Sequence, residues 1–368
     1  MKGRIVFMEQ KRLKVGIIGC GGIANGKHLP GLKSVENIQM VAFCDIIRER
    51  AEKAAREYGV EGAKVFENYH DLLAMDEIEA VHVCTPNSSH APITIDAFKA
   101  GKHVYSEKPM AKTYADAIAM CEAAEKAGKL LSIGYQTRSV PMFQLARNVV
   151  RNGMLGDVYY VKARNLRRRG IPTWGVFLDY EKQGGGPMID IGTHSIDSAL
   201  FIIDNYDVAS VTGVSYRKLG AKCAETNNGR LFTEDEYQVE DSAMGFIRFK
   251  NGCAMHIEAS WAINMEDCGY TPIIVGDKAG LSMRDGRVRL NGEINGSLYT
   301  EELETNRYTR DLFKGSDLNE CEYDMNQWIS AITEGTPLLA PGRKAAVVSQ
   351  IIEAIYTSAQ TGKTIYFD

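Results

Sequence analysis

The sequence lacks a long hydrophobic run, a paired set of cysteines and an excess of basic charge. No stretch approaches the roughly 20 apolar residues that a transmembrane helix needs. Residues 1–14 are charged and contain neither the apolar centre nor the small-residue cleavage site of a signal peptide. We therefore expect a cytoplasmic protein without a membrane partner.

Metal-binding and disulfide patterns are missing as well. The eight cysteines are scattered and form no CxxC pair, and the seven histidines show no HExxH spacing. Such scattered cysteines are typical of reduced thiols in a reducing compartment. The sequence therefore predicts neither a disulfide framework nor a metal centre.

The charge balance bears on the class of partner. The formal net charge is −4, which argues against a nucleic-acid partner because phosphate binding needs a net basic face. Arg167, Arg168 and Arg169 form the one basic cluster. We interpret this short run as part of a solvated loop, with anion binding as the alternative. The expected partner is a small molecule.

The length of 368 residues predicts two domains, which we place at 1–135 and 136–368. The first alternates short apolar runs with helical patterns, as βαβ units around a parallel sheet do. The expected strands are 13–18, 40–44, 80–84, 103–105 and 130–133, and the expected helices are 47–58, 90–100 and 114–127. We also expect left-handed glycines after these helices, at Gly59, Gly101 and Gly128. The overall class is α/β, with an N-terminal Rossmann domain.

The pattern changes from about Gly134. Longer strands of alternating character are expected at 158–165, 208–216, 241–249, 254–261, 273–275 and 287–290, with helices at 141–152, 191–203, 324–334 and 343–361. This predicts an α+β domain with a large, mostly antiparallel open sheet. Such a sheet needs a cover, so we expect a homo-oligomer, either a dimer or a tetramer, with a higher oligomer as the alternative. Residues 220–235 form a long polar loop that is either mobile or in contact with a partner.

A glycine-rich turn follows the first expected strand. Its G-x-G-x-x-A pattern consists of Gly19, Gly21, Gly22, Ile23 and Ala24. The glycines permit a tight turn and a close approach to a pyrophosphate, and Ala24 lets the helix pack closely on the strand. The helix N-terminus then offers free N–H groups to the phosphates. The pattern predicts a dinucleotide site.

Asp45 ends the second expected strand, at the distance typical of the residue that binds the adenosine ribose hydroxyls. Its charge would repel a 2′-phosphate, so NAD is favoured over NADP. Arg48 is a nearby cation that could offset this repulsion and contact the cofactor; the alternative is an ordinary arginine on a helix surface.

Three further motifs stand in order along the chain: Cys84-Thr85-Pro86-Asn87-Ser88-Ser89-His90, Glu107-Lys108-Pro109 and Asp190-Ile191-Gly192-Thr193-His194-Ser195-Ile196-Asp197. Together with the glycine turn they resemble the glucose–fructose oxidoreductase/inositol dehydrogenase (Gfo/Idh/MocA) family, along essentially the whole chain. The resemblance implies that Thr85, Pro86, Asn87 and His90 line the nicotinamide side of the cofactor.

The resemblance also implies that Glu107 and Lys108 end the fifth strand beside the cofactor, with a cis peptide bond before Pro109. Lys108 would then form a Lys/Asp/His catalytic set with Asp190 and His194 from the second domain.

The residue types support these roles separately from the resemblance. Lys108 ends a parallel strand, where open α/β sheets place their ligands, and a partly desolvated amine there suits proton transfer. The alternative is a lysine paired with Glu107 in a surface turn. Asp190 and His194 are four residues apart at a helix start, so both can face one cleft, and a histidine held by a carboxylate is a competent base near neutral pH. Asp197 could orient His194 as well, or pair elsewhere.

Further residues are candidates for a substrate wall. Aromatic faces and arginine side chains suit sugar rings and their hydroxyls; the candidates are Tyr135, Arg138, Arg164, Trp174 and Trp261, beside the catalytic set itself. Residues 184–187 (GGGP) either let the backbone approach a ligand or form a plain connector.

These observations predict an NAD-dependent oxidation of a secondary alcohol in a sugar, a glycoside or a cyclic polyol. We expect His194, oriented by Asp190, to accept the proton and Lys108 to stabilise the alkoxide; the reverse assignment stays open. The stretch from residues 165–167 to residues 185–188 resembles family members that oxidise carbon 3 of glycosides. The alternatives are an inositol-type dehydrogenase, a glycosidase that uses NAD transiently, and a non-catalytic sensor of NAD or sugar.

Overall fold

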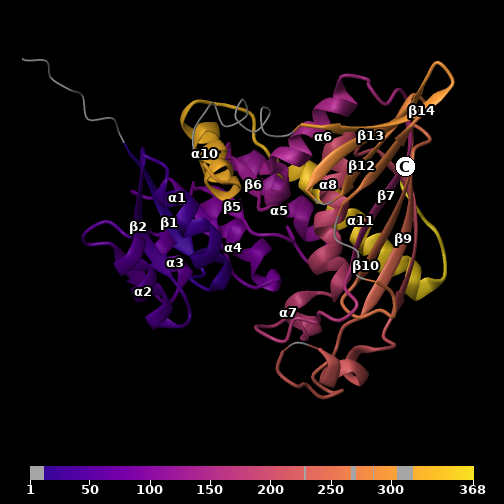
Figure 1. Cartoon of the computed structure of the whole chain (residues 1–368). Helices are drawn as coiled ribbons and strands as arrows, with labels where there is room; N and C mark the ends of the chain where they lie inside the picture. The colour runs from indigo at the N-terminus through magenta and orange to yellow at the C-terminus, as the bar shows by residue number, and fades with distance from the viewer. Residues whose placement is uncertain (1–11, 228, 267–270, 285, 305–317) are drawn as a thin grey trace, which may run out of the picture.

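The computed structural model describes residues 12–227, 229–266, 271–284, 286–304 and 318–368. These residues form two sheets, one of six strands and one of nine. Figure 1 shows the smaller sheet and its helices on the left and the larger sheet on the right.

The first sheet is a parallel Rossmann sheet. Its strands are β1 (Leu13–Ile18), β2 (Ile38–Cys44), β3 (Lys64–Phe66), β4 (Ala80–Val83), β5 (His103–Ser106) and β6 (Leu131–Ile133), in the order β3-β2-β1-β4-β5-β6. Every pairing is parallel. The order reverses between β1 and β4, and open α/β sheets bind ligands outside the carboxyl ends of the strands at such a point. The predicted Rossmann fold is confirmed.

The crossover segments carry η1 (Ala24–His28, a π-helix), α1 (Leu29–Lys33), α2 (Arg48–Tyr58), α3 (Tyr69–Leu73), α4 (Asn87–Lys99) and α5 (Tyr114–Ala127). Gly101 (φ 74°) and Gly128 (φ 63°) take the predicted left-handed conformation. The prediction for Gly59 is wrong: its φ is −73°. This glycine is required by space instead, because a Cβ there would stand 2.6 Å from the Ala55 carbonyl oxygen.

The second sheet is mostly antiparallel, as predicted. Its strands are β7 (Val158–Leu166), β8 (Val208–Tyr216), β9 (Ser242–Phe249), β10 (Ala254–Ser260), β11 (Ile273–Gly276), β12 (Ala279–Arg284), β13 (Arg287–Ile294), β14 (Ser297–Leu303) and β15 (Ile365–Tyr366). Their order is β14-β13-β12-β11-β7-β10-β9-β8-β15. Within the described strands, β7 and β10 make the single parallel pair of this sheet.

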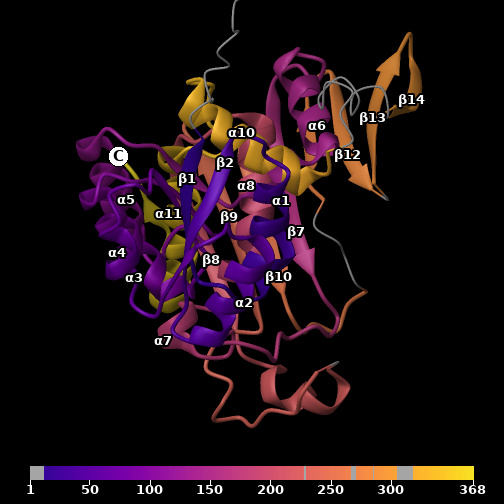
Figure 2. The ribbon, with the colours of Figure 1, turned by 90° about the vertical axis from the view of Figure 1, so that its left-hand side faces the viewer.

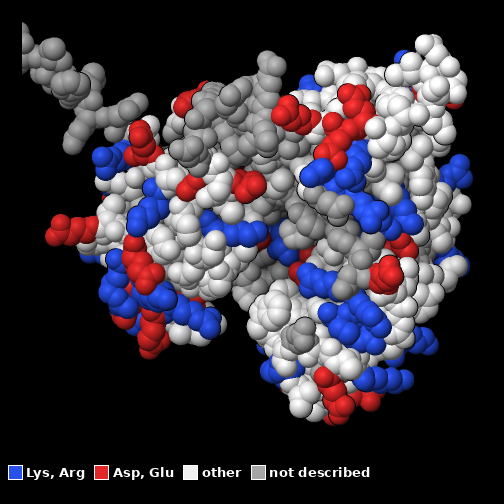
Figure 3. Space-filling model, in the orientation of Figure 1, with Lys and Arg blue, Asp and Glu red and all other residues white. Residues whose placement is uncertain are grey.

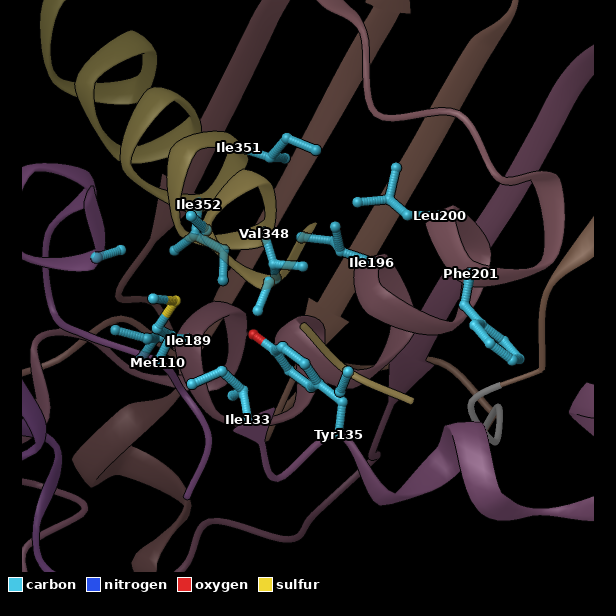
Figure 4. Close-up of a cluster of buried hydrophobic side chains, with 14 of the residues drawn as sticks. Met110, Ile133, Tyr135, Ile189, Ile196, Leu200, Phe201, Val348, Ile351 and Ile352 are labelled. Atoms are coloured by element: carbon cyan, nitrogen blue, oxygen red, sulfur yellow. The ribbon is translucent and has the colours of Figure 1, made fainter. Parts of the chain in front are cut away.

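Helices cover one face of this sheet (Figure 2). They are α6 (Pro141–Arg151), α8 (Thr193–Ile203) and α11 (Gly342–Thr361). Gly213 and Gly245 let α11 lie close to the strands, because a Cβ at either would stand under 3 Å from Ile355. Figure 4 shows Val348, Ile351 and Ile352 of α11 packed near Ile196 and Leu200 of α8.

The opposite face of the sheet, which we call the open face, carries exposed hydrophobic side chains. Val214 and Phe246 lie on strands β8 and β9 next to the glycines that face α11, so their side chains point the other way. Both are exposed large hydrophobic residues, as is Tyr216 two positions further along β8.

The helix α10 (Glu320–Thr333) returns to the first sheet although it lies late in the chain (Figure 1). Met325, Trp328 and Ile329 belong to the same buried cluster as Val15 and Tyr105 of the Rossmann strands. The Tyr105 hydroxyl donates to Asp324 Oδ2 at 2.5 Å. Among the described residues, no helix is both long and apolar enough to cross a membrane.

Candidate active site

The glycine turn leaves room for a ligand between β1 and η1. Gly19 is left-handed (φ 90°), and a Cβ there would meet the Cys84 carbonyl oxygen at 2.6 Å. By contrast, apart from the adjacent residues and the backbone of the same helix, no described atom lies within 4 Å of where a Cβ on Gly21 or Gly22 would stand. Ile23 and the buried Ala24 follow in the first turn of the helix. The open space lies where a pyrophosphate meets the helix N-terminus in a Rossmann fold.

Asp45 lies at the end of β2, beside this turn. Its carboxylate accepts hydrogen bonds from the backbone N–H groups of Cys20 (2.8 Å) and Ile47 (2.9 Å), which fix its orientation. Arg48 instead pairs with Glu52 at 2.9 Å and Glu67 at 3.5 Å on the surface. The structure therefore leaves the Asp45 charge without compensation from Arg48.

The segment from Thr85 to His90 begins α4 at the carboxyl end of β4. His90 is buried, and its ring nitrogens lie 2.7 Å from the Pro109 carbonyl oxygen and 2.8 Å from that of Thr85. The peptide bond between Lys108 and Pro109 is cis, as expected. His90 thus joins the Thr85–Pro86 turn to the Lys108–Pro109 turn, and burial lowers its pKa.

Two side chains of this region bear on ligand binding and domain contact. Asn87 Nδ2 donates to the Gln183 carbonyl oxygen at 2.9 Å, so the start of α4 touches the second domain. Thr85 Oγ1 is buried and has no hydrogen-bond partner in the described part of the chain. This hydroxyl lies at the carboxyl end of the sheet and could still form a hydrogen bond with a ligand.

Glu107 is buried beneath the active site and is held from three sides. It accepts hydrogen bonds from the Lys108 backbone N–H (2.9 Å) and from Gln136 (3.4 Å), and it pairs with His28 Nε2 at 2.8 Å. Burial opposes its charge, but the hydrogen bond and charge of His28 lower the pKa of Glu107 to about 2. Its side chain therefore supports the Lys108 turn from inside the domain.

His28 continues this network inward, because its Nδ1 lies 3.0 Å from Nδ1 of the buried His82. Burial opposes the charged form of His28, but Cys84 and Glu107 raise its pKa overall. Sequence reasoning missed both histidines, since neither belongs to a local motif.

Lys108 and Asp190 meet where the two domains face each other. Lys108 Nζ donates to Asp190 Oδ1 at 3.1 Å and to the Asp190 carbonyl oxygen at 3.2 Å. The other carboxylate oxygen of Asp190 accepts from Trp261 Nε1 at 3.2 Å. Asp190 lies in η3 (Met188–Gly192, a π-helix), which continues into α8 with His194 in its first turn.

Asp190 and His194 share this helix, but no hydrogen bond joins them in the structure. His194 Nδ1 is buried without a partner among the described residues, while the carboxylate of Asp190 is taken up by Lys108 and Trp261. The expectation that Asp190 orients His194 through a hydrogen bond is therefore corrected. Burial, followed by the charge of Lys108, lowers the pKa of His194 from 6.5 to about 3. The ring is thus neutral at ordinary pH.

Asp197 does not contact His194 either. It forms an interior ion pair with Arg138, whose Nη2 lies 2.6 Å and Nε 3.0 Å from the carboxylate oxygens. The exposed fractions are 1% for Arg138 and 0% for Asp197. Arg138 also donates to the Leu339 carbonyl oxygen. Of the two possibilities for Asp197, the pairing elsewhere is found, and Arg138 is a structural residue rather than part of a substrate wall.

Three other wall candidates also need correction. Tyr135 is buried in the hydrophobic cluster of Figure 4 and its hydroxyl bonds Thr193 Oγ1 at 3.1 Å. Trp261 is buried and holds Asp190. Arg164 follows the buried Ala163 on β7 and is in register with Glu258, so it points to the face of the sheet opposite the helices. Trp174, in contrast, is 64% exposed.

The glycine loop at 184–187 packs closely against Glu240 and Tyr356. Glu240 accepts hydrogen bonds from the backbone N–H groups of Gly186 (2.7 Å) and Met188 (3.2 Å) and from the Tyr356 hydroxyl (2.7 Å). A Cβ on Gly186 would stand 2.2 Å from the Glu240 carbonyl oxygen, and one on Gly185 2.3 Å from the Tyr356 hydroxyl. The carboxylate therefore caps the helix that carries Asp190 and His194. Sequence reasoning did not identify Glu240, which is 54 residues from Gly186 in the chain.

The long segment around η4 (Gly220–Thr226) packs on the loop that follows β7. Asn227 makes two hydrogen bonds to the backbone of Ile171, at 2.8 and 2.9 Å, and Arg230 bonds Thr173 through its backbone N–H and through Nε. Arg169 bonds Thr226 Oγ1 at 3.1 Å. The segment thus contacts its own chain, and the basic run contributes to the loop contacts.

The site therefore joins the two domains through the contact of Lys108 with Asp190. Figure 3 shows a notch between the two lobes on this face of the molecule. The carboxyl end of β5 supplies Lys108, the η3–α8 helix supplies Asp190 and His194, and the end of β10 leads to Trp261. The described residues contain no group of three or more His, Cys, Asp or Glu side chains placed to hold a metal ion.

Comparisons with known proteins agree with this architecture. Residues 13–135 match the Gfo/Idh/MocA model described as an oxidoreductase family with an NAD-binding Rossmann fold, and residues 147–367 match the model of its C-terminal alpha/beta domain. The chain is 34% identical over 363 residues to the D-glucoside 3-dehydrogenase of Escherichia coli (strain K12), covering 97% of this chain and 98% of the relative. It is 28% identical over 288 residues to the glucose-6-phosphate 3-dehydrogenase of Bacillus subtilis (strain 168), 77% of each chain.

Solved structures show the same fold. An oxidoreductase domain protein from Kribbella flavida matches with a TM-score of 0.82 and 25% identity, covering 97% of this chain and 100% of the other. A levoglucosan dehydrogenase in complex with NADH and levoglucosan matches with a TM-score of 0.83 and 21% identity, covering 97% and 99%.

Proposed function

The chain belongs to the Gfo/Idh/MocA oxidoreductase family and carries its NAD-binding Rossmann domain, and on this premise we propose that it oxidises the carbon-3 hydroxyl of a glucoside. The observation that carries the proposal is the convergence of Lys108, Asp190 and His194 at the carboxyl end of β5. The similarity to a D-glucoside 3-dehydrogenase over nearly the full length of both chains supports the choice of hydroxyl.

The residues present fit the cofactor. Gly21 and Gly22 border open space at a helix N-terminus, and the fixed carboxylate of Asp45 suits the two ribose hydroxyls. Thr85 Oγ1, buried and without a partner in the described chain, adds a polar atom on the nicotinamide side. When bound, NAD supplies the hydride acceptor. We assign a preference for NAD over NADP to the uncompensated charge of Asp45.

Side chains of the protein accept the proton of the substrate hydroxyl and hold its oxygen. We assign His194 as the proton acceptor, because the charges of Lys108 and Asp190 act on its ring and because that ring is neutral and so has a lone pair to accept a proton. Lys108 would hold the substrate oxygen through Nζ, while Asp190 fixes that amine. In the reverse assignment, Lys108 accepts the proton and His194 holds the oxygen. Lys108→Arg distinguishes the two, since arginine cannot deprotonate in the working range of pH.

The proposal extends to assembly and location. We propose that the chain is a cytoplasmic homo-oligomer, with domains at 1–135 and 136–368, in which a second copy covers the open face of the large sheet. The exposed Val214, Tyr216 and Phe246 support a covered face. Light scattering after size-exclusion chromatography tests this, and a monomer at micromolar concentration would contradict it.

An NAD-reduction screen over alkyl and aryl glucosides, inositols and free hexoses tests the reaction. We expect NADH formation with glucosides, and a 3-keto glucoside identified by NMR. Faster turnover of inositols would overturn the substrate assignment. Release of the aglycone without net NADH would indicate transient oxidation followed by elimination, and no turnover with any compound would indicate a sensor.

A further inference from the structure

An aromatic series leads outward from the catalytic carboxylate. The buried Trp261 donates to Asp190 Oδ2, and its ring lies 6.3 Å from that of Phe177 in an edge-to-face arrangement. Phe177 in turn lies 5.7 Å from Trp174, again edge-to-face. The inner member is fully buried and the outer member is 64% exposed. The series therefore connects the reacting centre with the surface of the second domain.

The loop that carries Trp174 is held at several points. Before Trp174, Asn227 bonds both the N–H and the carbonyl oxygen of Ile171, and Arg230 bonds Thr173 twice. After it, the loop runs into α7 (Tyr180–Gln183), whose last residue accepts the hydrogen bond from Asn87 of the Rossmann domain. The backbone is thus held on both sides of Trp174, and its later end contacts the Rossmann domain.

This arrangement exposes an aromatic ring where solvation alone would favour a polar one. An edge-to-face contact engages at most one face of an indole, so the Phe177 contact leaves most of the Trp174 ring free. A ring presented on a fixed loop loses little conformational freedom when another ring stacks on it. Aromatic residues with a free face are also well suited to the apolar faces of sugar and aryl rings.

We propose that Trp174 is the platform for the aglycone of the substrate, and that the preferred aglycone is itself ring-shaped, an aryl group or a second sugar. The inference rests on the proposed oxidation of a glucoside. The glucose ring would occupy the inner part of the site beside Lys108 and Asp190, and the group on its anomeric oxygen would point outward to Trp174, the exposed member of the series. A free hexose or a methyl glucoside would not reach the platform.

The test compares phenyl and methyl glucosides, in both anomeric forms, with the full-length wild type, Trp174→Ala and Trp174→Phe. We expect Trp174→Ala to lower kcat/KM for the phenyl glucoside by about tenfold, the scale of one aromatic pair. The kcat/KM for the methyl glucoside and the KM for NAD should each change by less than about twofold, because neither depends on stacking against Trp174. Trp174→Phe should recover most of the loss.

The matched control is Tyr159→Ala, which removes an aromatic side chain of similar exposure, 55%, from the start of β7. It should affect neither substrate. An equal loss for both glucosides in Trp174→Ala, or no loss for either, would overturn the platform while leaving carbon-3 oxidation in place. A wild type that oxidises neither glucoside would instead refute the proposed function itself. A change of oligomeric state in Trp174→Ala would assign the exposed ring to a subunit contact.

Discussion

The pH dependence of alcohol oxidation tests the assignment of His194 as the proton acceptor. An unperturbed histidine would lose activity as the pH falls through about 6.5. Burial and the charge of Lys108 lower the pKa of His194 to about 3 in the structure. The neutral, proton-accepting form therefore persists to much lower pH, and the rate controlled by His194 should be constant from about pH 5 upward.

The size of the effect follows from the two pKa values. At pH 5 about one His194 ring in a hundred carries a proton when its pKa is about 3, whereas about 97 in a hundred would do so at 6.5. A profile of kcat/KM, which reports the free enzyme, separates these cases clearly. The expected profile is flat between pH 5 and pH 8.

The assay is the initial rate of NADH formation across this range for the wild type, Lys108→Arg and His194→Gln. We expect Lys108→Arg to keep the flat shape with a lower plateau, and His194→Gln to lower the plateau by about 10²- to 10⁴-fold. Both variants should bind NAD like the wild type, because neither residue lies at the glycine turn. An inflection between pH 6 and pH 8 that survives in His194→Gln and disappears in Lys108→Arg would refute the reasoning and make Lys108 the base. Any fitted value would belong to the coupled pair, so the differences between variants decide the matter.

Three further predictions follow from described contacts. Asp45→Ser should lower the catalytic efficiency with NAD by about 10- to 100-fold, because charge-assisted hydrogen bonds are lost, and it should reduce the discrimination against NADP. If the ratio of the efficiency with NAD to that with NADP is the same as in the wild type, Asp45 does not determine the cofactor preference. Arg138→Ala should lower the free energy of unfolding by about 3–5 kcal/mol, because it leaves the buried Asp197 unpaired; urea denaturation measures this, and Arg343→Ala, which breaks the exposed pair with Glu125, should change little. Glu240→Gln should lower kcat about tenfold or more with the KM for NAD unchanged, since the helix bearing Asp190 and His194 loses its cap; Glu258→Gln, on the open face of the sheet, is the control, and an equal loss in both variants would count against a positioning role.

Local sequence patterns were enough to predict most of the Rossmann strands. Buried parallel strands such as β1 and β4 appear as mostly apolar runs, and the helix that follows β1 begins at a glycine turn. β3 was not predicted, because it has three residues and none of them is buried. β12 and β14 were missed as well: a glycine interrupts one, and most residues of the other are exposed.

In the candidate site, too, residues within local motifs could be predicted from the sequence and residues outside them could not. Lys108, Asp190 and His194 belong to contiguous motifs, so sequence identified them, and the contact between Lys108 and Asp190 is present. Their supporting residues are far away in the chain: Arg138 is 59 residues from Asp197, and His28 is 79 residues from Glu107. No periodicity or spacing rule joins such partners. Only the folded chain shows that Arg138 is part of an interior pair and that Arg164 faces away from the site.

The return of α10 to the first sheet has a consequence for biosynthesis. The N-terminal domain leaves the ribosome first, but Met325, Trp328 and Ile329, which complete one of its buried clusters, are made only after strands β1 to β14. Until then, the surface around Tyr105 lacks its cover, and the Tyr105 hydroxyl lacks Asp324. The nascent Rossmann domain therefore exposes part of its apolar surface until α10 has been synthesised. A fragment that ends at residue 135 would keep that apolar surface exposed.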